Sequence, residues 1–168
     1  MAKITNEKEA LAAVSKDGMA LEYVPENLKT PELCLVAVKK WGNALEYVPE
    51  NLRTPKLCLA AVKSDIGYPL HYVPENLRTP ELCLVAVRQD SEALRYVPEN
   101  LKTPELCLEA VKEIGRAIEF VPENLKTVEL YLEAVKSDIE GLALVPKALQ
   151  KEVRAALKNG AFVKKDPL

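Results

Sequence analysis

Hydrophobic and polar positions alternate along this chain in a pattern that repeats at a nearly constant interval. The stretch VPENLKTPELCLVAV at residues 24–38 comes back with few changes at 48–62, 73–87, 97–111 and 121–135. The interval is 24 residues, with one step of 25. Repetition at this period is typical of solenoids, in which each unit is too small to fold alone and buries its apolar side against its neighbours.

Polar residues in each repeat predict where its helix begins and ends. Thr30 is a good N-cap, and Pro31 fits the first helical position. Lys39 and Lys40 would lie in the last turn, and Gly42 is placed as a C-terminal stop. The segment between these signals therefore predicts a helix of about three turns.

The rest of the repeat predicts two shorter elements. NALEYV indicates a second helical segment, which has to end before Pro49 because proline excludes the α conformation for the valine before it. PENL fits one tight turn of 3₁₀ type. In the main helix, the residues expected to form the buried face are Leu33, Cys34, Leu35, Ala37 and Val38, and those of the remaining stripe are Glu32, Val36, Lys39 and Lys40.

These elements predict an all-α protein, a right-handed α-solenoid of 24-residue repeats with about seven main helices. We expect one domain over residues 1–168, with an N-terminal cap helix at 4–19, five repeats at 20–140, and a C-terminal cap with a basic tail at 141–168. A leucine-rich repeat is the alternative, because its period is similar and LCL could form its strand. The helix is favoured because a helix-start signal precedes the Leu-x-Leu and Ala-Val-Lys follows it.

The repeat ALEYVPENLKTPELCLEAVK resembles a tandem-repeat family of bacterial proteins that is grouped as a domain of unknown function. This resemblance covers residues 20–140. In period, and in its alternation of α and 3₁₀ turns, the chain is also similar to the leucine-rich-repeat variant solenoids. Both resemblances imply a stacked helical scaffold, and neither implies a catalytic residue.

Composition agrees with a soluble globular protein. Hydrophobic residues make up 48% of the chain and charged residues 29%, and the net charge is −2. The first ten residues lack the apolar core of a signal peptide, and no apolar run approaches the roughly 20 residues of a membrane helix. With four cysteines and no secretion signal, we expect a reducing, cytoplasmic location and no membrane association.

Residues able to carry chemistry occur once per repeat, which argues against a shared site. The cysteines would lie in a row at a helix spacing of about 8–10 Å, too far apart for a disulfide or a common zinc ion. They are Cys34, Cys58, Cys83 and Cys107, with Tyr131 in the fifth place. We therefore expect small buried hydrophobic residues. The glutamate row that begins at Glu26 is expected to meet free N–H groups of the tight turn. The sequence thus predicts no enzyme, no metal and no cofactor.

Positions that differ between repeats are the candidates for recognition. Val36, Ala60 and Val85 are apolar on a charged stripe, where the later repeats carry Glu109 and Glu133. Trp41 follows the main helix, and the second segment varies as Glu22, Glu46, His71, Arg95 and Glu119. The candidate partner-binding surface therefore comprises Val36, Trp41, Ala60, Tyr68, His71, Val85 and Arg95. The alternative is that neighbouring repeats cover these residues.

The function favoured by the sequence is a non-catalytic helical-repeat scaffold that mediates protein–protein interaction. One alternative is an accessory structural subunit of a larger assembly. Another, less favoured, is an RNA-binding helical repeat, which needs a basic row. The varying row is mostly acidic, and the local basic stretch is Lys147–Leu168. Pairing with a second copy stays open.

Overall fold

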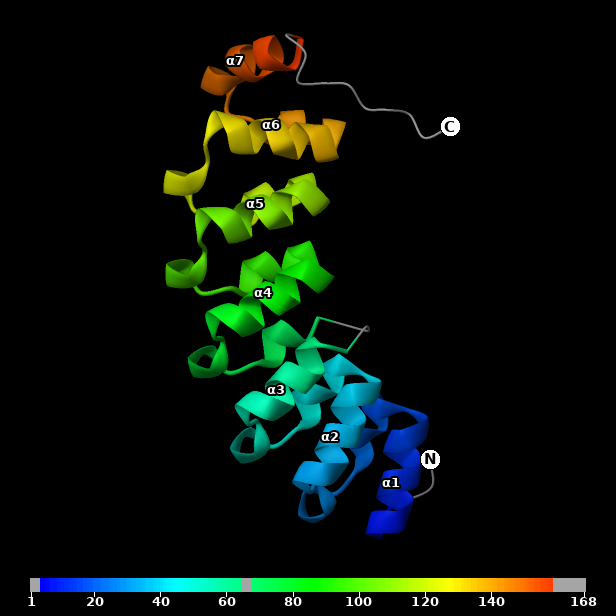
Figure 1. Cartoon of the computed structure of the whole chain (residues 1–168). Coiled ribbons are helices and arrows are strands. Elements are labelled where there is room, and N and C mark those ends of the chain that lie inside the picture. Colours follow the sequence, from blue (N-terminus) through cyan, green and yellow to red (C-terminus); the bar gives the residue numbers. More distant parts are fainter. Residues whose placement is uncertain (1–3, 65–67, 159–168) are drawn as a thin grey trace. The chain divides into compact units, whose positions relative to one another are not determined.

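The computed structural model describes residues 4–64 and 68–158, and in these residues long helices alternate with short ones (Figure 1). No β-strand occurs within the described ranges. The main helices are α1 (Glu7–Lys16), α2 (Pro31–Lys40), α3 (Pro55–Val62), α4 (Pro80–Gln89), α5 (Pro104–Glu113), α6 (Val128–Ser137) and α7 (Lys147–Lys158). The segment LCL lies inside α helices, so the leucine-rich-repeat alternative is wrong.

A 3₁₀ helix, here called the return, follows each of the first six main helices. The returns are Gly18–Tyr23, Gly42–Tyr47, Pro69–Tyr72, Ser91–Tyr96, Gly115–Phe120 and Ile139–Leu144. A second, shorter 3₁₀ turn, here called the link turn, leads from the first five returns to the next main helix. The link turns are Glu26–Leu28, Glu50–Leu52, Glu75–Leu77, Glu99–Leu101 and Glu123–Leu125. The predicted helix-plus-3₁₀ repeat is therefore confirmed.

The chain divides into two compact units. The first contains Met1–Gln89 with Tyr96–Pro98, and the second contains Asp90–Arg95 with Glu99–Leu168. In the first unit α1 packs on α2, α2 on α3 and α3 on α4, and in the second α5 packs on α6 and α6 on α7. Each unit is thus a stack of helical repeats. The right-handed sense of the solenoid and its extent as one domain stay predictions, and the tail beyond residue 158 lies outside the described residues.

Main helices begin as their sequence signals predict. The Thr30 hydroxyl oxygen accepts a hydrogen bond from the Leu33 N–H at 3.2 Å, and Pro31 occupies the first turn. The same cap recurs at Thr54, Thr103 and Thr127. An N-cap of this kind is worth about 1 kcal/mol, because it satisfies an N–H that has no partner in the helix.

Main helices end differently from the prediction. Gly42 does not cap α2, because Trp41 already leaves the helix in an extended conformation and its N–H donates to the Ala37 oxygen at 2.9 Å. The glycine instead begins the return. Gly115, at the equivalent place in the second unit, shows the reason: an added Cβ would lie 2.3 Å from the Ala134 carbonyl oxygen of α6. Close approach between the return and the next main helix, and not a left-handed backbone, therefore favours glycine at Gly115, whereas the return Ser91–Tyr96 begins with serine.

The buried face of each main helix is narrower than predicted. In α2 it consists of Leu33, Cys34, Ala37 and Val38, whereas Leu35 is half-buried like Val36. These two residues flank the exposed stripe on opposite sides. The half-exposed leucine recurs in every main helix from α2 to α6.

A basic residue at the end of each of the first four link turns joins one repeat to the next. Lys29 is only 7% exposed in its side chain, and its ammonium donates to the Tyr47 carbonyl oxygen at 3.0 Å. It also donates to the Glu26 carboxylate at 2.6 Å. In the second unit Lys102 makes the equivalent hydrogen bond to the Phe120 oxygen at 2.9 Å. Glu26 therefore begins the turn, as predicted, and it pairs with a lysine.

Arginine makes a more extensive version of this contact. Arg53 donates to the Val48 oxygen at 2.9 Å, to the Tyr72 oxygen at 3.1 Å and to the Glu46 oxygen at 3.1 Å. Arg78 binds the corresponding oxygens of Val73 and Tyr96 at 2.9 and 2.7 Å. Each guanidinium thus connects the return before it with the return after it.

We expect Arg53→Met to lower the free energy of unfolding by about 2–4 kcal/mol, because three carbonyl oxygens, two of them in partly buried hydrogen bonds, lose a charged donor. Urea denaturation followed by circular dichroism measures this change. Lys56→Met is the matched control, since Lys56 is exposed on the neighbouring helix. Equal, small effects of the two substitutions would contradict the role given to Arg53.

Candidate functional site

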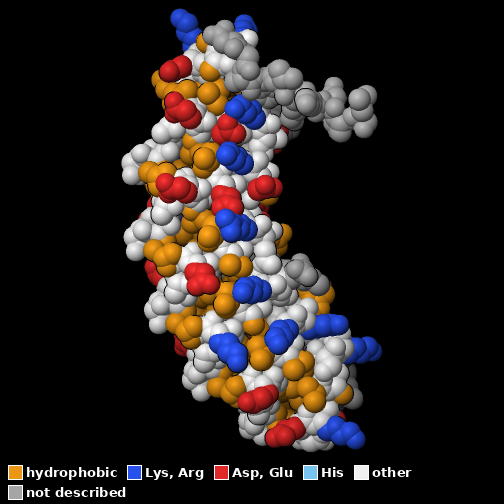
Figure 2. All heavy atoms as spheres, in the orientation of Figure 1, with side chains coloured by type: hydrophobic (Ala, Val, Ile, Leu, Met, Phe, Trp, Pro, Cys, Tyr) orange, Lys and Arg blue, Asp and Glu red, His pale blue; other side chains and the backbone are white. Residues whose placement is uncertain are grey.

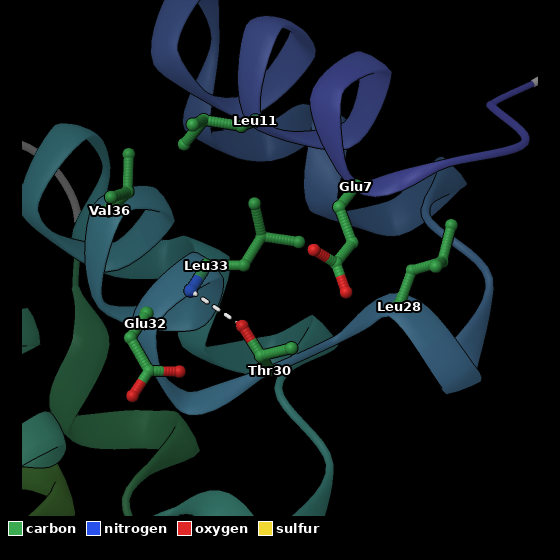
Figure 3. A pocket seen from close by; sticks show the side chains of 7 residues that line it. All are labelled: Glu7, Leu11, Leu28, Thr30, Glu32, Leu33 and Val36. Atoms are coloured by element: carbon green, nitrogen blue, oxygen red, sulfur yellow. Dashed lines mark hydrogen bonds between the residues drawn. The ribbon is translucent and has the colours of Figure 1, made fainter.

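Shallow hollows open on the surface between adjacent main helices. The hollow between α1 and α2 has a volume of about 160 Å³. Figure 3 shows Leu11 of α1 and Leu33 and Val36 of α2 around it, with Leu28 of the link turn beside them. The other lining residues are Glu7, Thr30 and Glu32. The Thr30 cap hydrogen bond fixes the first turn of α2, and so fixes where Leu33 lies.

Equivalent hollows occur elsewhere in both units. One between α2 and α3 has a volume of about 200 Å³, and its leucines are Leu35, Leu52 and Leu57. One between α5 and α6 has a volume of about 310 Å³, and its leucines are Leu108, Leu125 and Leu130. Leu11, Leu35 and Leu108 hold the same place in their repeats. The hollow is therefore a property of the repeat, created where the half-exposed leucine meets the next main helix.

One wall of the hollow differs between the two units. Val36 lines the hollow between α1 and α2, whereas Glu133 holds the equivalent place between α5 and α6 and pairs with Lys136 at 2.6 Å. Ala60 and Val85 are half-buried in the same helix position of α3 and α4. Neighbouring repeats thus cover these three apolar residues only in part. Together with Leu11 of α1, these three residues define the surface that is here called the main-helix face of the first unit.

Two larger hydrophobic side chains extend the apolar surface of the first unit. Leu11 is 48% exposed, and Trp41 at the end of α2 is 37% exposed. The sequence interpretation did not single out Leu11. It could have been found from the period, because Leu11 stands one repeat before Leu35.

Basic residues follow the same periodicity near the C-terminal ends of the main helices. Lys39, Lys63 and Arg88 hold this place in the first unit, and Lys112 and Lys136 in the second. Figure 2 shows hydrophobic side chains over α1–α3 with Lys and Arg side chains beside them. The sequence interpretation did not recognise this row, since it compared the positions that vary and not those that keep a charge.

The remaining candidate residues belong to the returns. Tyr68 is exposed just before the return Pro69–Tyr72, and its N–H donates to the Asn43 side-chain oxygen at 2.7 Å. His71 is exposed, as predicted, and its ring lies 5.0 Å from that of Tyr72. Arg95 belongs to the second unit. Tyr68 and His71 thus belong to the segment of the return, whereas Val36, Ala60 and Val85 belong to main helices.

The cysteine side chains are buried, as predicted. Cys34, Cys58, Cys83 and Cys107 are each 0% exposed and carry free thiols. Burial raises the pKa of all four thiols, to about 11 for Cys34 and for Cys107. In the described part of the chain, no group of three or more His, Cys, Asp or Glu residues is arranged to hold a metal ion.

We expect the folded protein to react with Ellman's reagent at pH 8 far more slowly than the denatured chain. A thiol with a pKa of about 11 is a thiolate in only about one molecule in a thousand at that pH. The unfolded thiols lose their protons from about pH 9, whereas the folded Cys34 thiol keeps its proton until about pH 11. Because the unfolded chain therefore binds fewer protons in this range, the free energy of unfolding should fall as the pH rises from about 9 to about 11. Four fast-reacting thiols in the native protein would contradict this account.

None of the helices in the described ranges has both the length and the apolar character needed to cross a membrane. The predicted cytoplasmic location stays a prediction.

Comparison with known protein families identifies the family to which the repeat belongs. The model of the family described as "Domain of unknown function (DUF4116)" matches residues 6–53, 55–102 and 103–150. The first match contains α1 and α2, the second α3 and α4, and the third α5 and α6. No curated protein and no solved structure matches the chain. Because the three consecutive matches cover most of its length, the chain belongs to the tandem-repeat family DUF4116.

Proposed function

We propose that the chain is a non-catalytic helical-repeat scaffold that binds a protein partner through the main-helix face of its first unit. The observation that best supports this is the open apolar hollow between α1 and α2, with half-exposed Leu11 and Val36 in its walls. Helical repeats present such surfaces over several neighbouring units. Apolar side chains of the partner would enter successive hollows.

The charges beside the hollows favour a partner with carboxylates. Lys39 follows Val36 by one helical turn, and Lys63 follows Ala60 in the same way. The positions of Val36 and Ala60 are apolar, so they offer these lysines no carboxylate. In the second unit Glu109 and Glu133 replace these apolar residues, and Glu133 neutralises Lys136. A partner segment with aliphatic and acidic side chains therefore suits the first unit better than the second.

A non-catalytic role agrees with the placement of the reactive residues. Repeats give equivalent residues equivalent surroundings, whereas a pair of catalytic carboxylates needs two different environments. The thiols are buried and their raised pKa leaves little thiolate, so they are poor nucleophiles. RNA binding is the weaker alternative, because the aromatic residues of the early returns stand beside Glu22 and Glu46 and not beside lysines.

We expect Val36→Glu to abolish partner binding while it leaves the fold intact. The carboxylate would have to be desolvated when an apolar side chain entered the hollow, which costs at least tenfold in affinity. Glu109 and Glu133 already occupy this helix position, so the repeat accepts glutamate there. The measurement is quantitative affinity purification from native cells with the wild type and the variant, combined with thermal unfolding of both.

Glu50→Gln is the matched control for a changed carboxylate, since Glu50 lies exposed in a link turn. Loss of the same proteins with Val36→Glu but not with Glu50→Gln, at similar melting temperatures, supports the proposal. If Val36→Glu unfolds the protein, or if it retains every bound protein, the main-helix face is not the binding surface.

A further inference from the structure

The returns carry a second repeated feature, which the proposed function does not use. The first five end in an aromatic residue, namely Tyr23, Tyr47, Tyr72, Tyr96 and Phe120. The residue before the aromatic varies as Glu22, Glu46, His71, Arg95 and Glu119. Here this second position is called the slot.

In two repeats, the slot residue contacts the aromatic ring of the following repeat. In the second unit, the guanidinium carbon of Arg95 lies 4.8 Å from the centre of the Phe120 ring. In the first unit, the ring of His71 lies 4.7 Å from that of Tyr96. The Arg95 distance is within the range of a cation–π interaction, about 6 Å. The chain itself therefore shows that a cationic side chain fits against this ring.

Carboxylates occupy the slot in the first two repeats, beside the tyrosines. The Glu22 carboxylate beside the Tyr23 hydroxyl raises the pKa of Tyr23, through hydrogen bonding and then through its negative charge. Burial is the main cause that raises the pKa of Tyr72, and hydrogen bonding to Glu46 is the second. Tyr23 is 52% exposed, Tyr47 and Tyr72 are half-buried, and both glutamates are exposed. Rings and carboxylates thus share one accessible surface.

The cations of the neighbouring link turns donate to groups other than the slot carboxylates. The Lys29 ammonium is held by the Tyr47 oxygen and by Glu26, and the Arg53 guanidinium is held by backbone oxygens. The Glu22 and Glu46 carboxylates are thus not among the acceptors of these two cations, although the Arg53 guanidinium lies 3.1 Å from the Glu46 carbonyl oxygen.

We propose that Glu22 and Glu46, together with Tyr47 and Tyr72, bind arginine side chains of a basic protein segment. A guanidinium suits both components, because its plane stacks on an aromatic face and its edge donates two hydrogen bonds to a carboxylate. Adjacent packed helices lie about 8–10 Å apart, a distance that three residues of extended chain can span. In the polyproline II conformation every third side chain lies on one face, about 9 Å apart, so arginines at every third position of such a segment match successive repeats. This surface uses none of the main-helix hollows, so it stands independently of the proposed function.

The test is fluorescence anisotropy of labelled peptides with the full chain at low salt. One peptide contains four Arg-Gly-Ser units, and the other has lysine in place of every arginine. We expect the arginine peptide to bind several-fold more tightly than the lysine peptide of equal charge. Glu46→Arg should lower the affinity for the arginine peptide at least tenfold, because an arginine at this place would cover Tyr72 as Arg95 covers Phe120.

Glu50→Arg is the matched control, since it makes the same charge change at an exposed residue of a link turn, outside the slot. It should lower the affinity for the arginine peptide only about twofold, because the added charge acts only through screened long-range repulsion. Thermal unfolding of both variants checks the fold, which Arg95 shows to be compatible with arginine in the slot. The proposal is overturned by equal losses in the two variants, by equal affinity for the two peptides, or by no binding of either peptide at millimolar concentration.

Discussion

The hydrogen bond from a link-turn cation to the next return is the interaction on which the stack depends. Each of the first five returns ends at an aromatic residue just before a Val-Pro pair, and proline has no N–H and cannot continue the helix. The last carbonyl oxygens of the return therefore lack partners from their own helix. Lys29 and Arg53 supply the missing donors from the preceding repeat. One repeat thus completes the backbone hydrogen bonding of the next, in addition to burying its apolar face.

This arrangement also limits what the protein can do. Stacking places equivalent side chains one helix apart, so identical cysteines or glutamates cannot converge on one substrate atom or metal ion. Function then depends on the positions that differ between repeats, such as Val36 against Glu133 or Glu46 against Arg95. These differences lie on surfaces, because the buried positions hold the stack together.

Local signals in the sequence were sufficient to predict the period, the helix starts and the 3₁₀ turns. Thr30 and Pro31 act within one turn of chain, so their effect can be foreseen without knowledge of the neighbours. Gly42 was misassigned as a helix cap, because the need for glycine comes from the next main helix and not from its own backbone. The roles of Lys29 and Arg53 were missed for the same reason, since their acceptors lie in the following repeat. The hollow was missed because Leu35 was counted as buried, although the distance between main helices leaves it half-exposed.

The most direct measurement of the central claim is NMR spectroscopy of the lysine ammonium groups in ¹⁵N-labelled protein near neutral pH. Ammonium protons that are buried and hydrogen-bonded exchange slowly with water, whereas those of exposed lysines exchange too fast to be observed. The account predicts resolved, slowly exchanging ammonium signals from Lys29 and Lys102, each assigned by a Lys→Arg substitution, and none from Lys39 or Lys40. Exchange at Lys29 and Lys102 as fast as at Lys39 would contradict it.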